Sequence, residues 1–331
     1  MEYLEDLVLQ SIGQLTDINI NPWLHNISKN NEIISNKNSI TLRYIAKVIC
    51  VANTLHNVIQ QGRRMSLREL YYHNTWLFDN QNQATVIVRK ISIMLRIPRS
   101  TLGLFPSPKG MIGGRITFRY KDIEVLNIDN MGITGAIIGD NFEDIGEQNN
   151  IEVESDAQYI IVIEKASIFQ YLMERKISDR FSCILITGKG FPDIATRKLI
   201  SYLVYKLKIT TLYLGDYDPP GINIYLTYVR GSDNYESLIV ACPHIYFMGI
   251  HYEDTFDLPC TTQIPLTRND KTVLSNLLSD PVVKACNKLH GQCKMMFKSG
   301  YKCELEAFQA ISSDFLVNSY LPNKLLKRSW I

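Results

Sequence analysis

The sequence predicts a mixed α/β protein of two domains. A helical domain that ends in a basic β-hairpin is followed by an α/β domain with a mainly parallel sheet. The chain has 331 residues, which is longer than a usual single domain. Residues 41–104 carry apolar side chains at helical spacing. From about residue 157 onward, continuous apolar runs alternate with helical segments, which is typical of βαβ units.

The composition is that of a folded globular protein. Hydrophobic residues make up 46% of the chain and charged residues 21%, which excludes a disordered or collagen-like chain. The chain starts with acidic residues and lacks an apolar run of about 18 residues, so we expect neither a signal peptide nor a transmembrane helix. Seven cysteines without a Cys-x-x-Cys pair indicate free thiols in a reducing compartment.

The formal net charge of +2 conceals two segments of opposite charge. Residues 61–120 hold ten Lys and Arg against two acids, and residues 121–180 hold five against thirteen acids. A basic surface beside carboxylates favours phosphate binding on one side and metal binding on the other. Ordinary solvated surface charge is the alternative interpretation.

The first domain is predicted to be helical. Apolar residues at spacings of three and four predict a helix over 41–60. Ser66 and Glu69 form a capping box, which begins a second helix. The same periodicity predicts a third helix over 84–95 and a short fourth one around Ser100–Leu104.

Residues 109–118 predict a hairpin that turns at Gly113 and Gly114. Three helices followed by a basic hairpin form the winged helix-turn-helix arrangement, which binds DNA. Helix-turn-helix units also dock proteins, and the basic charge of this segment favours DNA over that alternative. We therefore expect four segments: an N-terminal extension at 1–38, a winged-helix domain at 39–125, an acidic connecting segment at 126–156, and an α/β domain with a C-terminal extension at 157–331.

The second domain is predicted to hold a parallel sheet. Its buried strands are expected at 159–163, 182–187, 210–214 and 245–250. Helical segments separate them at 165–175, 192–208 and 222–230.

Three carboxylates follow two of these strands. Glu164 ends the first strand, and Asp216 and Asp218 follow the third. Parallel sheets bind ligands at the carboxyl ends of their strands, so these side chains can converge. Hard oxygen ligands suit Mg²⁺, which also takes substrate phosphates as ligands. The alternative is that the Asp pair only caps a turn, because Asp-x-Asp-Pro-Pro-Gly is good turn chemistry.

Tyr71 and Tyr72 lie in the second helix, where a tyrosine pair usually packs in the core. Arg68 lies four residues before Tyr72 and shares its helix face, whereas Tyr71 is rotated by about 100°. A guanidinium near a phenol favours the phenolate and can hold a phosphate. Tyr72 is therefore the candidate nucleophile.

The C-terminal region contains a loosely zinc-like set, namely Cys286, His290, Cys293 and Cys303. The first three also fit one face of a helix, and no paired Cys-x-x-Cys motif accompanies them. We favour a structural role for these residues.

Three stretches resemble the A subunit of type IIB DNA topoisomerase (topoisomerase VI) and its eukaryotic relatives that make meiotic double-strand breaks. They occur in the family's order and together cover roughly residues 40–250. They are Arg68–Tyr72 with Pro98–Ser100 and Lys109–Gly110, then Ile186–Arg197, then Gly215–Ile222 with Tyr228–Ser232. The resemblance implies a winged-helix domain that carries the nucleophile and a Toprim domain that carries the metal.

The family's motifs assign roles to residues of this chain. The resemblance implies Tyr72 as the nucleophile, Arg68 as its basic neighbour, and Lys109 as the lysine of the wing. The Toprim acids correspond to Glu164, Asp216 and Asp218, which would hold Mg²⁺, with Mn²⁺ as a substitute. DNA contacts are expected from Lys109, Arg99, Arg115, Lys189 and Phe191.

The chain departs from the family's pattern at two places. Residues 105–108 read Phe-Pro-Ser-Pro where small residues are usual, and Pro220 stands where an aromatic residue or His is usual. Both lie beside functional positions, so local DNA geometry is expected to differ. The length, the cysteine content and the divergent N-terminus favour the meiotic branch.

The resemblance implies a reaction by transesterification in which Tyr72 becomes joined to a 5′ phosphate of DNA. It also implies a homodimer, a partner similar to the topoisomerase VI B subunit, other meiotic accessory proteins, and a nuclear location. The chain lacks a Gly-x-x-x-x-Gly-Lys loop, so any ATP-dependent gating is expected from that partner. The alternatives are a hydrolytic Toprim nuclease, which would not need Tyr72, and a non-catalytic DNA-binding scaffold.

Overall fold

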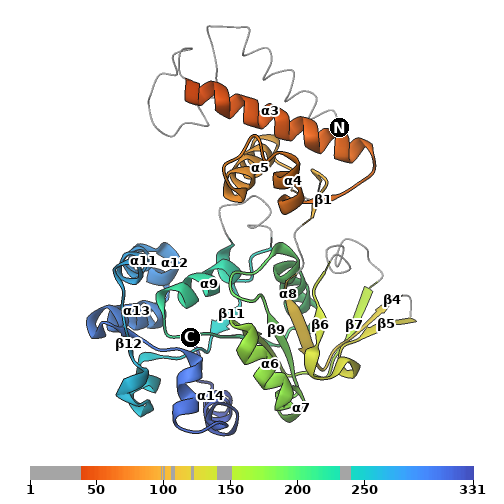
Figure 1. The fold of residues 1–331 in the computed structure, drawn as a ribbon. Coiled ribbons are helices and arrows are strands. Elements are labelled where there is room, and N and C mark those ends of the chain that lie inside the picture. The colour runs from red at the N-terminus through yellow and green to blue at the C-terminus, as the bar shows by residue number, and fades with distance from the viewer. Residues whose placement is uncertain are drawn as a thin grey trace. The chain divides into compact units, whose positions relative to one another are not determined.

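The structure is a computed structural model that describes residues 39–97, 99, 101–105, 109–120, 123–139, 151–231 and 240–331. These residues form two compact units (Figure 1). The first holds the described residues up to 105, and the second holds those from 109 onward. The expected N-terminal extension at 1–38 lies outside the described residues.

The first unit contains the three helices that the periodicity predicts. They are α3 (Ser39–Gln60), α4 (Leu67–His73) and α5 (Gln81–Leu95), and both α3 and α4 pack against α5. Leu55, Leu70 and Ile91 are fully buried between them. The predicted capping box is confirmed, because Ser66 Oγ accepts from the Glu69 N–H at 3.1 Å and Glu69 accepts from the Ser66 N–H.

The described part of the expected fourth helix is not helical, because residues 101–103 form a turn. Leu104 begins β2 (Leu104–Phe105), which pairs in parallel with β1 (Met65–Ser66). This pairing ties the end of the first unit to the N-terminus of α4, whose cap residue Ser66 belongs to β1.

The second unit is built on a six-stranded sheet in the order β11-β10-β8-β9-β3-β6. Its strands are β3 (Met111–Gly114), β6 (Ala136–Ile137), β8 (Tyr159–Ile163), β9 (Cys183–Thr187), β10 (Thr210–Leu214) and β11 (Ile245–Phe247). The four strands from β8 to β11 are parallel, as the buried apolar runs predict. Strands β3 and β6 continue the sheet in antiparallel pairs beyond β9.

Helices connect the parallel strands. They are α6 (Ala166–Glu174) with α7 (Ile177–Arg180), α8 (Ile194–Leu207), and α9 (Pro219–Arg230). The chain steps from β8 to β9 in one direction and from β9 to β10 in the other, so right-handed crossovers place α6 and α7 opposite α8 and α9. This explains why the strands are apolar on both faces.

The predicted hairpin at 109–118 is wrong. These residues belong to the second compact unit, whereas the sequence places them in a first domain that ends at residue 125. Met111–Gly114 instead forms β3, which pairs with β9 in the central sheet. The glycine pair serves close packing: a Cβ on Gly113 would lie 2.5 Å from Met173 Sδ, and one on Gly114 would lie 2.5 Å from the Cys183 carbonyl oxygen. Side chains at these positions would therefore push β3 away from β9 and α6.

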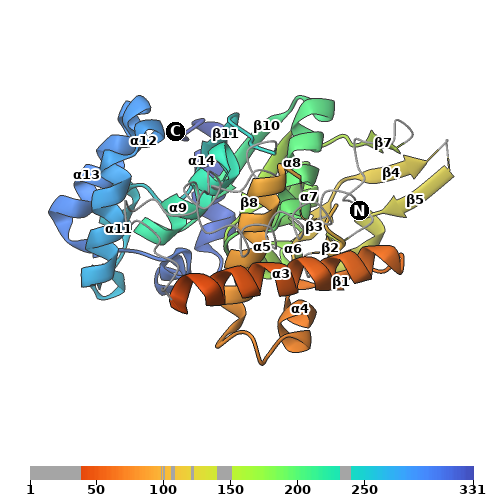
Figure 2. The ribbon, with the colours of Figure 1, turned by 90° about the horizontal axis from the view of Figure 1, so that it is seen from above.

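A hairpin does form one strand later. Strands β4 (Thr117–Tyr120), β5 (Ile123–Asn127) and β7 (Ile151–Glu154) make a separate antiparallel sheet in the order β5-β4-β7. Residues of the expected acidic connecting segment at 126–156 thus lie in β7 and at the end of β5. Within the second unit, Figures 1 and 2 place this sheet and helices α11 (Arg268–Ser279), α12 (Pro281–Ala285) and α13 (Asn287–Ser299) on opposite sides of the central sheet.

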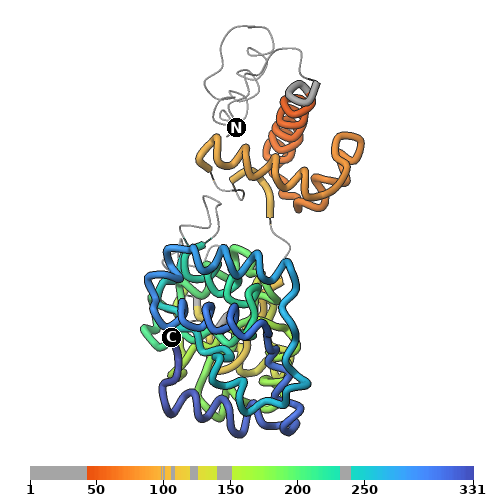
Figure 3. Tube along the Cα trace, turned by 90° about the vertical axis from the view of Figure 1, so that its left-hand side faces the viewer, coloured from red at the N-terminus to blue at the C-terminus, as the bar shows by residue number. Residues whose placement is uncertain are grey.

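The C-terminal region completes the second unit with short elements. They are β12 (Ile264–Pro265) and β13 (Tyr301–Lys302), 3₁₀ segments at Tyr252–Asp257, Cys260–Thr262 and Leu305–Ala310, a π-helical turn at Leu316–Tyr320, and α14 (Leu321–Leu326). Another 3₁₀ segment, Asp129–Thr134, occurs earlier in the chain, between β5 and β6. Figure 3 shows the carboxyl terminus within this unit, where Ile331 exchanges backbone hydrogen bonds with Phe247 of β11. In the part of the chain described, no helix is both long and apolar enough to cross a bilayer.

Candidate nucleophile and metal-binding acids

Helix α4 presents Tyr72 to solvent beside a guanidinium. The Tyr72 side chain is 58% exposed, and Arg68 Cζ lies 5.7 Å from the centre of its ring. Tyr71 is half-buried, and it packs against the core of the first unit. The two tyrosines of the pair therefore have different environments, as the helix geometry predicts.

The acids lie at the carboxyl ends of two neighbouring strands in the second unit. Glu164 follows β8 and its N–H donates to the Leu214 carbonyl of β10 at 3.0 Å. Its Oε2 accepts from the Asp216 N–H at 3.1 Å and from the Tyr213 hydroxyl at 3.2 Å. Asp218 caps α9 by accepting from the Gly221 N–H at 2.6 Å.

The first turn of α9 packs so closely against the carboxylates that only glycine fits at position 221. A Cβ at Gly221 would lie 2.8 Å from both Glu164 Oε2 and Asp218 Oδ1. The turn after β10 therefore brings α9 directly against the carboxylates.

Burial raises the pKa of all three acids. Glu164 and Asp216 are only 6% and 2% exposed. Burial, followed by the charges of Asp216 and Asp218, raises the pKa of Glu164 to about 8. Burial raises the pKa of Asp216 to about 6 although its ion pair with Lys165 acts in the opposite direction, and burial also raises the pKa of Asp218. Such buried carboxylates favour a nearby positive charge.

The nearest positive charge is one that the sequence analysis missed. Lys165 Nζ lies 2.8 Å from Asp216 Oδ2, 3.1 Å from Glu304 and 2.8 Å from Glu306. Burial alone would lower the pKa of Lys165, but these ion pairs raise it. The only sequence signal was its position next to Glu164 at a strand end.

The donor chemistry of the three acids fits a hard divalent cation, because all three offer carboxylate oxygens at one sheet edge. In the structure these oxygens have partners within the chain. Glu164 accepts from the Asp216 N–H, and Asp218 accepts from the Gly221 N–H. Asp216 pairs with Lys165 and accepts from the Leu305 N–H. Among the described residues, no three His, Cys, Asp or Glu side chains are grouped so that they could hold a metal ion. In the zinc-like set, Cys293 and Cys303 are buried in the core, as expected for residues with a structural role.

A second loop lies beside the acids and carries two of the expected DNA contacts. Residues 188–193 follow β9, and the Gly190 N–H donates to the Glu164 carbonyl at 2.9 Å. Lys189 is exposed with a left-handed φ of 52°, and Phe191 is 50% exposed. Lys109 is held to this loop, because its Nζ donates to the Phe191 carbonyl and its N–H donates to Asp193 Oδ2 at 3.2 Å.

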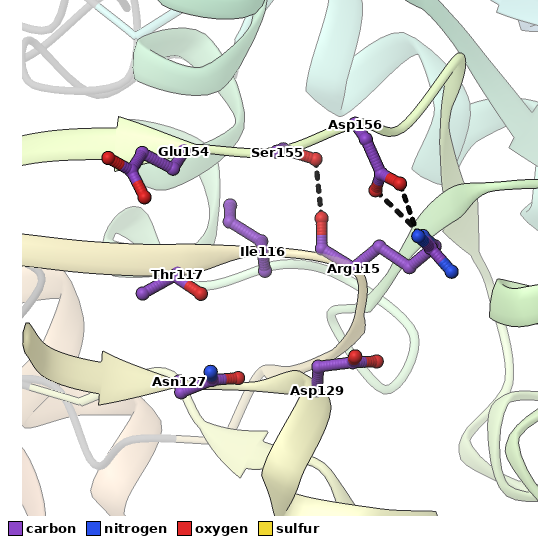
Figure 4. A pocket seen from close by; sticks show the side chains of 8 residues that line it. All are labelled: Arg115, Ile116, Thr117, Asn127, Asp129, Glu154, Ser155 and Asp156. Atoms are coloured by element: carbon purple, nitrogen blue, oxygen red, sulfur yellow. Dashed lines mark hydrogen bonds and ion pairs between the residues drawn. The ribbon is translucent and has the colours of Figure 1, made fainter.

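The other two expected DNA contacts lie elsewhere. Arg99 lies in the turn at the end of the first unit, where its carbonyl accepts from the Leu102 and Leu104 N–H groups. Arg115 lines a shallow pocket of about 400 Å³ and pairs through two nitrogens with Asp156 (Figure 4). The same pocket also holds Asp129 and Glu154, so Arg115 sits in acidic surroundings.

Two family descriptions match the chain. The Toprim domain of the topoisomerase 6 A-chain/Spo11 family matches residues 159–325, and the type IIB DNA topoisomerase family matches residues 43–104. The chain belongs to the topoisomerase VI A/Spo11 family. This confirms the expected family, the Toprim fold of the second unit, and the type IIB topoisomerase class.

Members of the topoisomerase VI A/Spo11 family from plants and animals align with most of the chain. The A3 subunit of DNA topoisomerase 6 from Oryza sativa subsp. indica is 32% identical over 298 residues, which are 89% of this chain and 66% of the relative. The corresponding A subunit from Arabidopsis thaliana is 30% identical over 89% of this chain and 71% of its own length. The meiotic recombination protein SPO11 of Homo sapiens is 31% identical over 86% of this chain and 72% of its own length.

Proposed function

We propose that this chain is the DNA-cleaving subunit of a topoisomerase-like transesterase that makes double-strand breaks in meiotic recombination. The observation that carries the proposal is the exposed Tyr72 ring with the Arg68 guanidinium beside it, in a chain whose second unit is a Toprim domain. The relatives named for meiotic recombination support the biological role.

The proposed reaction exchanges one phosphodiester for another. The Tyr72 oxygen attacks a backbone phosphorus, the phenolic proton is lost to solvent, and the bond from phosphorus to the DNA 3′ oxygen breaks. The 3′ oxygen takes up a proton, and the protein stays joined to the 5′ phosphate. Arg68 stabilises the negative charge of the phenolate and of the phosphorane.

The acids would hold the metal. Glu164, Asp216 and Asp218 are the residues proposed to bind Mg²⁺ or Mn²⁺, which when bound would supply Lewis-acid stabilisation of charge on the phosphate and the leaving oxygen. Because Tyr72 and the acids belong to different compact units, a dimer in which one protomer supplies the tyrosine and the other the acids is compatible with the chain. We propose such a homodimer, assisted by meiotic accessory proteins and by a partner similar to the topoisomerase VI B subunit, in the nucleus.

Duplex DNA is proposed to contact the loop beside the acids. Lys189 and Phe191 are exposed there, and Lys109 is anchored to the same loop. Arg99 would add a phosphate contact from the first unit. Arg115 would have to leave Asp156 to reach a phosphate, so it is the weakest member of the expected set. Phosphate contacts position a duplex without reading its sequence, so weak sequence preference is expected.

A covalent-trapping experiment tests the proposal. The chain, with and without a B-type partner, is incubated with end-labelled supercoiled or bent duplex and Mn²⁺, then denatured. The expected result is label that migrates with protein and is lost in Tyr72→Phe and Asp216→Ala but kept in Tyr71→Phe. Nicking without an adduct, unchanged in Tyr72→Phe, would establish a hydrolytic nuclease instead. Binding without cleavage by a forced dimer with its partner would establish a scaffold.

A further inference from the structure

We infer that Lys165 is an internal counter-ion that a divalent metal must displace from Asp216, and that Glu304 and Glu306 receive its ammonium group as it leaves. The inference rests on the proposed metal-binding function of the acids. It adds three residues to that site, and two of them come from a part of the chain about 140 positions away from Lys165.

The contacts of Lys165 carry the inference. Its Nζ lies 2.8 Å from Asp216 Oδ2, on a carboxylate that is only 2% exposed. The other oxygen of that carboxylate accepts from the Leu305 N–H at 2.8 Å. Both oxygens of Asp216 therefore accept from donors of the chain itself, and the ammonium beside Oδ2 repels a second cation that approaches this oxygen.

A destination for the ammonium already exists. Lys165 Nζ also contacts Glu304 at 3.1 Å and Glu306 at 2.8 Å, so it can leave Asp216 and keep two carboxylate partners. Those two residues are less buried than Asp216, with side chains 45% and 35% exposed. Water can therefore help solvate the displaced charge, which lowers the cost of the exchange.

The segment that carries the two glutamates is fastened to the acidic loop. Cys303 exchanges backbone hydrogen bonds of 2.9 and 3.0 Å with Tyr217, the residue that separates Asp216 from Asp218. Residues 303–306 therefore keep their place when the lysine side chain moves, and the exchange needs a change of side-chain conformation only.

The test measures Mn²⁺ binding by the full chain, from the electron paramagnetic resonance signal of free Mn²⁺. Lys165→Met is expected to bind Mn²⁺ about tenfold more tightly, because the competing charge is gone. Glu306→Gln is expected to weaken Mn²⁺ binding several-fold in the wild-type background. In the Lys165→Met background the same substitution is expected to weaken it much less. Such non-additivity is what a shared partner produces. Arg175→Met, at the opposite end of helix α6 and paired with Asp314 at 2.7 Å, is the matched control and is expected to leave binding unchanged.

Equal weakening by Glu306→Gln in both backgrounds would overturn the inference, since simple charge effects add. Loss of Mn²⁺ binding in Lys165→Met would also overturn it. Asp216→Asn separates the two proposals: unchanged binding in this variant would refute the metal site itself. Lys165→Arg, which retains the charge, guards against misfolding of the Met variant and is expected to bind no more tightly than wild type.

Discussion

At the scale of single residues, the proposed chemistry depends on one turn of α4. Arg68 and Tyr72 are four positions apart, so the helix places the guanidinium beside the phenol. The capping box at Ser66 begins the helix at Leu67 and thereby sets which face they share. The neighbour Tyr71 packs inward, which leaves Tyr72 as the exposed ring of the pair.

Arg68→Ala is expected to slow formation of the covalent DNA adduct by about 10²–10³-fold, the usual loss when one donor to a developing negative charge is removed. Arg68→Lys should retain part of the rate, because a lysine keeps the charge but not the planar pair of donors. The measurement is the single-turnover rate at saturating DNA. Arg63→Ala, an exposed arginine of the same unit, is the control and should react normally. A normal rate in Arg68→Ala would remove Arg68 from the mechanism.

Lys109 and Arg115 are expected to differ in DNA binding although both are basic residues of the second unit. Lys109→Ala should weaken binding of duplex DNA and reduce the slope of log affinity against log salt by about 0.9, the loss of one phosphate contact. Arg115→Ala should leave the slope unchanged, because its guanidinium is already paired with Asp156. Equal effects of the two variants would contradict the assignment made from their surroundings.

At the scale of elements, the start of α9 decides the geometry of the acids. Asp218 caps the helix and Pro219 occupies its first position, where a missing N–H costs nothing. The alternative that Asp218 serves turn chemistry is thus part of the observed structure, and it coexists with a location beside Glu164. Gly221 then lies where a side chain would strike both carboxylates.

Gly221→Ala is expected to abolish Mn²⁺ binding and to lower the free energy of unfolding by about 1–3 kcal/mol, the usual cost of overpacking. Gly291 in α13 is the matched control, because a Cβ there meets nothing within 4 Å. Gly291→Ala should stabilise the protein by about 0.5–1 kcal/mol, since alanine is the better helix former. Denaturant unfolding and Mn²⁺ titration check both variants, and retained Mn²⁺ binding in Gly221→Ala would refute the packing argument.

At the scale of the whole molecule, the second unit is closed by its C-terminal region. A buried polar network lies there: His251 Nδ1 is 3.1 Å from Lys324 Nζ, and Lys324 pairs with Asp254 at 2.6 Å. The Tyr320 hydroxyl donates to the same Asp254 oxygen at 3.0 Å. Burial, with the Lys324 charge second, lowers the pKa of His251 from 6.5 to about 4. The folded protein therefore holds this histidine neutral.

This network predicts acid sensitivity. The unfolded chain protonates His251 first as pH falls, so the contribution of His251 to the free energy of unfolding is complete above about pH 6.5 and is lost towards pH 4. The lost contribution to the free energy of unfolding is up to about 3 kcal/mol. His251→Asn should flatten the fall in stability between these values, whereas His244→Asn, at an exposed position, should retain it. Denaturant unfolding across this pH range is the measurement, and equal slopes in wild type and His251→Asn would contradict the prediction.

Local patterns of the sequence determined the elements that carry the site. Apolar runs marked β8, β9 and β10 because both faces of these strands are covered, and spacings of three and four marked α3 and α5. The positions of Tyr72 and of the acids followed directly, because each is fixed by its own helix or strand end. The motifs shared with the topoisomerase VI A/Spo11 family are local in the same sense.

Contacts between distant segments were decided only by the tertiary structure. Gly113 and Gly114 suggest a turn from sequence, but they allow β3 to pack closely against β9, some 70 positions later. From its sequence context Arg115 is expected to contact DNA, but in the structure its guanidinium pairs with Asp156. Lys165 gains its role from Glu304 and Glu306. The physical reason is common to all three. The charge partners and close neighbours of a residue come from segments far away in the sequence, whereas the spacing of apolar side chains indicates only local helices and strands.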